Sequence, residues 1–134
     1  FPGQIPALIH TVYQANSDPR IRCRLAAALA KAWVYGGDAE RGRPYADEAV
    51  ASAAVFDSPE ILCEALDSAL LTRWGPDQLA QRASLAARLD SAAAHLTEIE
   101  ARLSAHLWRL TTAWESLDVV GAVEADTVCS QRVR

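Results

Sequence analysis

Apolar and polar residues follow one another along most of this chain with the period of an α-helix. Leucine, alanine and tryptophan return every three or four residues, as in Leu62, Leu66 and Leu70, so that they share one side of a helix. Alanine and leucine dominate the apolar residues, and both favour helices by intrinsic propensity. Runs of valine, isoleucine or aromatic residues that would favour strands are few. The pattern predicts an all-α protein.

Turn and capping residues divide this pattern into separate helices. Asp18-Pro19 and Asp57-Ser58-Pro59 each provide an N-cap followed by proline at the first helical position. Gly36-Gly37 and Gly75-Pro76 are predicted to end helices, with Gly75 in a left-handed cap, and Thr97 to Glu100 has the form of a capping box. The predicted helices run over 19–35, 43–56, 59–74, 76–96, 97–115 and onward through Val128, with a further short helix within residues 1–18.

The helical pattern itself recurs along the chain at a fixed interval. The numbers of Trp33 and Trp74 differ by 41, those of Trp74 and Trp114 differ by 40, and tryptophan is rare enough for this spacing to be informative. Other large or small apolar residues keep nearly the same offset: Leu29, Leu70 and Leu110, then Tyr45/Leu85, Ala46/Ala86, Ala49/Leu89 and Ala53/Ala93. A period of about 40 residues built from two helices is typical of stacked helical hairpins. We therefore expect a single domain, 1–134, with repeat units at about 19–57, 58–96 and 97–134.

The stretch from Arg73 to Ala86 carries a resemblance to a known family. Its Arg-Trp-Gly-Pro-Asp-x-Leu-x-x-Arg-x-x-Leu-Ala sequence resembles the tetratricopeptide-like repeat regions of large actinobacterial regulators, among them the streptomycete antibiotic regulators and the LuxR-type large ATP-binding regulators. The resemblance extends over roughly residues 22–126, with an extra Gly42 as a departure. It implies a right-handed solenoid of about three antiparallel helix pairs. It also implies a cytoplasmic module within a larger signalling or transcriptional regulator, and it carries over no catalytic residue.

Charge and composition narrow the classes of partner. The net charge of −4 argues against a general attraction to nucleic acid. Arg20, Arg22 and Arg24, with Arg41 and Arg43, form too small a basic group for a nucleic-acid interface, so we expect no direct contact of this segment with nucleic acid. No apolar run is long enough to span a membrane. The chain has no methionine and begins with Phe, which we interpret as a segment of a longer protein.

The residue types that usually carry chemistry lack the spacing that chemistry needs. Cys23, Cys63 and Cys129 form no C-x-x-C pair, which fits a reducing cytoplasm rather than a disulfide or zinc scaffold. Cys23 and Cys63 lie one repeat period apart, so we interpret both as packing residues. The histidines show no metal-binding spacing either: they are His10, His95 and His106. We expect no catalytic, cofactor-binding or metal-binding residue.

The functional expectation is a surface that binds a protein partner or a neighbouring domain. The repeated tryptophans are predicted to be inter-helix core, so that Trp74→Ala should cost about 3–5 kcal/mol, while Trp108 lies outside their phase and should be partly exposed. The proposed partner-binding residues are Glu64, Asp67, Arg73, Trp108 and Arg109. The alternative is a small-ligand sensor or an enzyme with a pocket between helices. An apolar face containing Val119, Val120, Val123 and Val128 further predicts a homodimer through the terminal hairpins.

Overall fold

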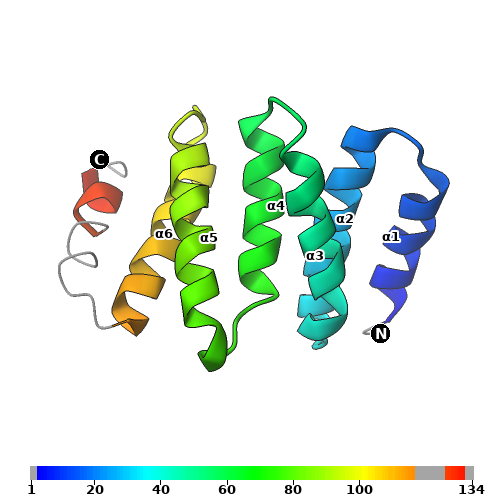
Figure 1. Ribbon diagram of the computed structural model, residues 1–134, viewed down its shortest axis with the longest axis horizontal. Coiled ribbons are helices and arrows are strands. Elements are labelled where there is room, and N and C mark those ends of the chain that lie inside the picture. The colour runs from blue at the N-terminus through cyan, green and yellow to red at the C-terminus, as the bar shows by residue number, and fades with distance from the viewer. Residues whose placement is uncertain (1–2, 117–125, 132–134) are drawn as a thin grey trace. The chain divides into compact units, whose positions relative to one another are not determined.

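The computed structural model describes residues 3–116 and 126–131, and this part of the chain is helical without strands. The helices are α1 (Gln4–Ala15), α2 (Pro19–Tyr35), α3 (Ala39–Ala53), α4 (Pro59–Leu71), the 3₁₀ turn η1 (Pro76–Gln78), α5 (Leu79–Ala93) and α6 (Ile99–Glu115), as Figure 1 shows. Residues 126–131 are also helical. The prediction of an all-α protein is confirmed. Within the described residues, no helix is both long and apolar enough to cross a membrane.

The chain divides into two compact units, Phe1–Trp74 and Gly75–Arg134. The division falls between α4 and α5, so the predicted pairing of these two helices stays a prediction. In the first unit, α2 packs on α1, α3 and α4, and α3 also packs on α4. In the second unit, α5 packs on α6. Val119, Val120 and Val123, which carried the expected dimer face, lie outside the described residues.

Small side chains allow α2 and α3 to approach each other closely. Ala26, Ala30, Ala46 and Ala49 are completely buried within the first unit. Gly42 lies against the backbone of Ala30, and a Cβ atom at this glycine would be only 2.6 Å from the Ala30 carbonyl oxygen. The extra glycine noticed in the sequence is therefore required by close helix packing.

Capping side chains account for the starts of α2, α3 and α4. The side chains of Asp18 and Ser58 accept hydrogen bonds from the backbone amides of Arg20 and Ile61, as predicted for N-caps. The expected start of α3 near Arg43 is wrong. The helix begins at Ala39 because Asp38 caps it by accepting from the amide of Arg41, and Pro44 lies inside the helix.

Two other capping predictions are wrong. The backbone of Gly75 has φ −107°, so it is not a left-handed cap, and α4 already ends at Leu71. Among the glycines that the structure describes, the left-handed one is Gly37, with φ 87°, after α2. The capping box of Thr97 does not form either, since α6 starts at Ile99 after Glu98, without a side-chain cap.

The helix boundaries repeat with the period found in the sequence. The helices α2, α4 and α6 begin at Pro19, Pro59 and Ile99, and α3 and α5 begin at Ala39 and Leu79. Positions predicted to be equivalent are also buried in both units: Ala46 and Ala86, Ala49 and Leu89, and Ala53 and Ala93. A two-helix period is therefore present in the described helices as well as in the sequence.

Candidate functional site

The predicted partner-binding acids on α4 are held by basic residues of α2. The guanidinium of Arg24 donates to the Glu64 carboxylate at 3.0 Å from Nε and 2.6 Å from Nη2. The ammonium of Lys31 lies 2.8 Å from the Asp67 carboxylate. These pairs join two neighbouring helices of the first unit. A partner that uses Glu64 or Asp67 has to compete with a cation of the chain itself.

The predicted partner-binding arginines are also engaged within the chain. Arg73 is paired with Asp47 of α3 and donates to the carbonyl of Ala69 at 3.3 Å. Arg109 donates to the Asp90 carboxylate at 3.2 Å, which links α6 to α5. The polar members of the predicted site therefore belong to four separate ion pairs. Glu64 and Asp67 each join α4 to α2, Arg73 joins the end of α4 to α3, and Arg109 joins α6 to α5.

The predictions for the tryptophans are wrong in both directions. Trp74 and Trp114 were expected in the core but are 60% and 56% exposed, whereas Trp108, expected to be partly exposed, is only 8% exposed. The helix starts also correct the repeat position that the spacing assigned to Trp33. Trp74 and Trp114 follow Pro59 and Ile99 by the same interval, and the residue at that interval after Pro19 is Val34. Trp33 therefore belongs to a different position of the repeat.

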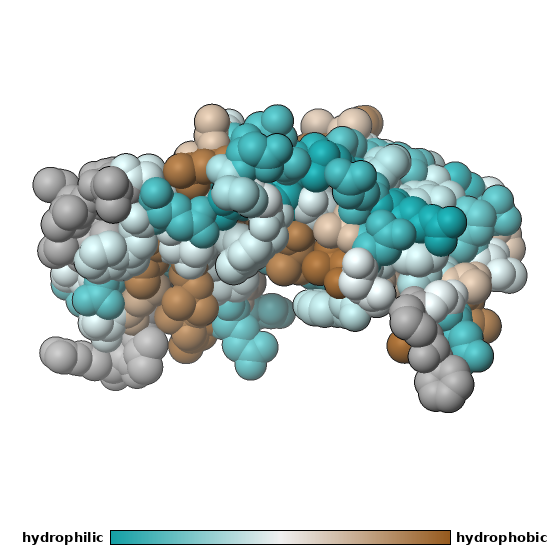
Figure 2. Space-filling model, turned by 90° about the horizontal axis from the view of Figure 1, so that it is seen from below, coloured by the Kyte–Doolittle hydropathy of each residue, from teal (hydrophilic) through white to brown (hydrophobic). Residues whose placement is uncertain are grey.

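Large apolar side chains gather on the exposed side of α6. Leu107 is 57% exposed and lies two helical turns before Trp114, so that both occupy the same side of the helix. Figure 2 shows hydrophobic areas, coloured brown, separated by hydrophilic surface. Exposed aromatic and apolar side chains of this kind are typical anchors of protein–protein interfaces.

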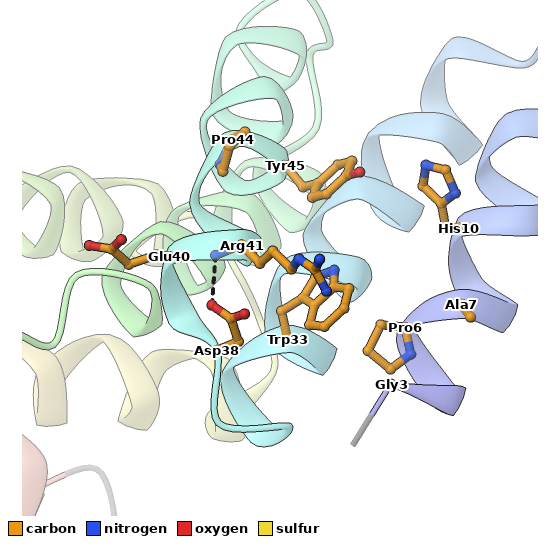
Figure 3. Close-up of a pocket in the computed structure, with 10 residues that line it drawn as sticks. All are labelled: Gly3, Pro6, Ala7, His10, Trp33, Asp38, Glu40, Arg41, Pro44 and Tyr45. Carbon is orange, nitrogen blue, oxygen red and sulfur yellow. Dashed lines mark hydrogen bonds between the residues drawn. The ribbon is translucent and has the colours of Figure 1, made fainter. Parts of the chain in front are cut away.

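A cavity of about 700 Å³ opens in the first unit between α1, α2 and α3 (Figure 3). Its aromatic walls come from all three helices: His10, Trp33 and Tyr45. The guanidinium of Arg41 lies over the Trp33 ring, 4.7 Å from the ring centre, and the rings of His10 and Tyr45 meet edge to face at 6.0 Å. Such a lining can hold a planar or apolar group by stacking. Sequence analysis missed this cavity because its residues come from three separate segments.

Tyr13 fixes the position of α1 beside this cavity. Its hydroxyl donates to both carboxylate oxygens of Glu48 on α3 at 2.6 Å. Burial raises the pKa of the Tyr13 hydroxyl, and the hydrogen bond to Glu48 raises this pKa further. The guanidinium of Arg22 stacks on the Tyr13 ring at 4.3 Å. The stacking on Arg22 therefore joins α1 to α2, and the hydrogen bonds to Glu48 join α1 to α3.

Cys23 and Cys63 are packing residues, as predicted. Both are buried, and the Cys23 thiol donates to the carbonyl of Ala49 at 3.3 Å. Burial raises the pKa of the Cys63 thiol to about 11, assisted by the carboxylate of Glu60. A raised pKa disfavours the reactive thiolate. In the described part of the chain, no three His, Cys, Asp or Glu side chains are grouped so that they could hold a metal ion.

Two buried polar side chains of the second unit, Arg82 and His106, face partners that sequence analysis did not identify. The side chain of Arg82 is almost fully buried, is paired with Glu115 and donates to the carbonyl of Gly75 at 3.2 Å. Nδ1 of His106, also buried, lies 3.1 Å from the Asp90 carboxylate. The partners of Arg82 and His106 are distant in the sequence, so helical spacing alone could not predict these pairs. These contacts hold α5 and α6 together.

Comparison with models of known protein families, with curated proteins and with solved structures finds no match to this chain. The function is therefore argued from the geometry above.

Proposed function

We propose that this chain is a helical-repeat interaction module that binds a protein partner or a neighbouring domain. The observation that carries the proposal is the pair Leu107 and Trp114, two large apolar side chains that share one exposed side of α6. An apolar group of this kind on a charged surface is typical of an interface. Trp74, at the corresponding repeat position in the first unit, is exposed to a similar degree.

The finer architecture that accompanies this proposal is a tetratricopeptide-like right-handed solenoid of about three antiparallel helix pairs. The constant period of the helix starts supports it. Solenoids of this class present the first helix of each pair on a concave surface that binds extended segments. In the proposed arrangement, these first helices are α2, α4 and α6.

The proposed setting is a cytoplasmic signalling or transcriptional regulator of which this chain forms one part. Its support is the resemblance of the Arg73 to Ala86 stretch to the repeat regions of large actinobacterial regulators. In that setting, the module receives a signal through its partner and carries no chemistry of its own. Glu64, Asp67, Arg73 and Arg109 then contribute to partner binding by exchanging an incoming charge for their present ion-pair partner within their own unit.

A displayed library of random peptides tests the binding surface before any natural partner has been identified. We expect selection on the folded chain to enrich related apolar sequences, and we expect a Leu107→Ser/Trp114→Ser variant to bind them at least tenfold more weakly, since truncating an interface anchor typically costs more than about 1 kcal/mol. The matched control is Val55→Ser, which removes an apolar side chain that is 82% exposed elsewhere on the chain. Enriched peptides that bind both variants equally would contradict the proposed surface.

The cavity beside Trp33 supports a second candidate, a small-ligand sensor. Trp33 and Tyr45 supply stacking surfaces, and Arg41 supplies a cation at the Trp33 ring. A panel of planar aromatic carboxylates, followed by thermal shift, tests this candidate. Binding that is lost in Trp33→Leu and kept in Leu107→Ser would favour the sensor over the interaction module.

A further inference from the structure

The guanidinium of Arg41 lies over an aromatic ring in the wall of the cavity between α1, α2 and α3. It is 4.7 Å from the centre of the Trp33 ring, and the Arg41 side chain is exposed. Among the residues that the structure describes, no carboxylate forms an ion pair with this guanidinium. Its N–H donors are therefore available to a ligand, while the contact with Trp33 restricts where the guanidinium can lie.

The rest of the cavity wall is mainly apolar or aromatic. Pro6 and His10 of α1 lie across the cavity from Arg41 and Trp33 (Figure 3), and the ring of Tyr45 on α3 meets the His10 ring edge to face. The volume of about 700 Å³ is within the range of pockets that hold small molecules. The cavity therefore combines one anchor for a charged group with stacking surfaces for a planar ring.

The charges of the wall determine which charged group fits. Asp38 and Glu40 are acidic, and Arg41 is the one described wall residue with a permanent positive charge. The Glu40 carboxylate points away from the aromatic rings (Figure 3), and Asp38 accepts a hydrogen bond from the backbone amide of Arg41. A carboxylate brings one negative charge, which an arginine can bind through two parallel hydrogen bonds. A phosphate monoester brings about two negative charges, and the second would meet Asp38 without a second arginine or lysine in the described wall.

We infer that this cavity binds a planar aromatic monocarboxylate, with the carboxylate held by the Arg41 guanidinium and the ring inserted toward His10 and Tyr45. The inference rests on the second candidate function, the small-ligand sensor, and names the ligand class of its site. Because α1 contributes one wall of the cavity, the bound ring contacts α1 together with α2 and α3. Binding therefore opposes the local opening of α1.

A series of naphthalene derivatives tests this ligand class on the original chain. Its members share the ring and differ in the polar group: naphthoate, naphthamide, naphthyl phosphate and naphthylmethylammonium. We expect naphthoate to bind about tenfold or more tightly than naphthamide, because hydrogen bonds to a charged group are the stronger ones. The phosphate and the ammonium compounds should bind more weakly than naphthoate. Decahydronaphthoate, which has the same carboxylate on a puckered ring, should also bind more weakly because it stacks poorly. Isothermal titration calorimetry measures each dissociation constant.

The outcomes of this series separate failure of the inference from failure of the sensor function. Equal affinity for naphthoate and naphthamide, or tighter binding of the ammonium compound, would keep a ligand site and overturn the carboxylate assignment. Equal affinity for naphthoate and decahydronaphthoate would overturn the planar ring. No binding of any member would contradict the sensor function, and the inference with it.

Arg20 provides a matched control for Arg41. Each is an exposed arginine in the first turn of a helix, and each donates its backbone amide to a capping aspartate. The Arg20 guanidinium also lies over a ring, 5.4 Å from the centre of Phe56, but neither residue belongs to the cavity wall. We expect Arg41→Gln to remove the preference for naphthoate over naphthamide and Arg20→Gln to leave it unchanged. Arg41→Lys should keep part of the preference, since lysine has the charge without the paired donors. A preference that survives in Arg41→Gln would overturn the inference.

Amide hydrogen exchange of α1 gives a readout that a merely structural role of Arg41 would not produce. Saturating naphthoate should slow this exchange in the original chain and in Arg20→Gln, but not in Arg41→Gln. Without ligand, the three proteins should exchange alike, because both arginine side chains are exposed. If the thermal midpoint of Arg41→Gln falls several degrees below that of Arg20→Gln, Arg41 supports the fold, and the comparison of naphthoate with naphthamide on the original chain still decides. Exchange of α1 that naphthoate leaves unchanged in the original chain would overturn the assigned pose.

Discussion

At the scale of single residues, burial distinguishes positions that look alike in the sequence. Ala30 and Gly42 are two small residues in an alanine-rich chain, yet the contact between them sets the distance between α2 and α3. The sequence showed Gly42 only as an irregularity in the repeat. The role of Gly42 depends on how closely α2 approaches α3. Residue spacing along the sequence does not give the distance between two helices.

Gly42→Ala should therefore destabilise the first unit. The added Cβ would lie 2.6 Å from the Ala30 carbonyl oxygen, and backbone cannot move aside as a flexible side chain can. Overpacking of this kind costs about 1–3 kcal/mol of unfolding free energy. Urea unfolding measures it, with Gly3→Ala as the control, since a Cβ at Gly3 would meet nothing within 4 Å. Equal stability of the two variants would contradict the close approach of α2 and α3.

The buried thiol of Cys63 gives a prediction about pH. With a pKa of about 11 in place of the ordinary 9.0, it should react with iodoacetamide at pH 8 about 100-fold more slowly than an unperturbed thiol, because its thiolate fraction is that much smaller. The folded state then holds this proton more tightly than the unfolded state. The group's contribution to stability should be fully present below pH 9 and decline between pH 9 and 11. Mass spectrometry of alkylated peptides, compared with the half-exposed Cys129, measures the rate, and equal rates would contradict the burial.

At the scale of helices, local signals predicted some of the helix starts, whereas the contacts that join one helix to another lay beyond their range. Asp18 and Ser58 cap their helices because an N-cap needs only residues within one turn. The box at Thr97 has the right residues, but α6 starts only at Ile99. The ion pair of Arg82 with Glu115 joins α5 and α6 between distant points of the sequence, beyond the range of any helical spacing rule.

Glu115→Ala should be costly because it leaves the guanidinium of Arg82 buried without its carboxylate. Breaking a buried ion pair by removing one partner typically costs about 3–5 kcal/mol, and the partial exposure of Glu115 places this case at the lower end. Glu64→Ala is the matched control, since the Arg24–Glu64 pair is exposed and such pairs contribute less than about 1 kcal/mol. Calorimetric unfolding of both variants compares them. A smaller loss for Glu115→Ala would show that Arg82 is solvated.

At the scale of the whole chain, the repeat period could be predicted from the sequence, but the position of each tryptophan within its repeat could not. Helix class, the repeat period and the equivalent alanines of α3 and α5 all followed from the sequence. The tryptophans suggested a first repeat one residue longer than the helix starts show, so Trp33 does not share the repeat position of Trp74 and Trp114. On a helix, one residue is a rotation of about 100°. An error of one residue in register therefore assigns a side chain to a different side of its helix.

Two tryptophans of the same helix test the assignment of core and surface directly. Trp108→Ala should lower the unfolding free energy by about 3–5 kcal/mol, as expected for truncation of a buried aromatic side chain. Trp114→Ala should cost less than about 1 kcal/mol, since more than half of this side chain is already in contact with water. Both lie on α6, so helix propensity contributes equally, and chemical denaturation followed by circular dichroism compares them. Trp114 should also account for most of the acrylamide quenching of α6. The opposite order of stabilities would contradict both the burial of Trp108 and the exposure of Trp114.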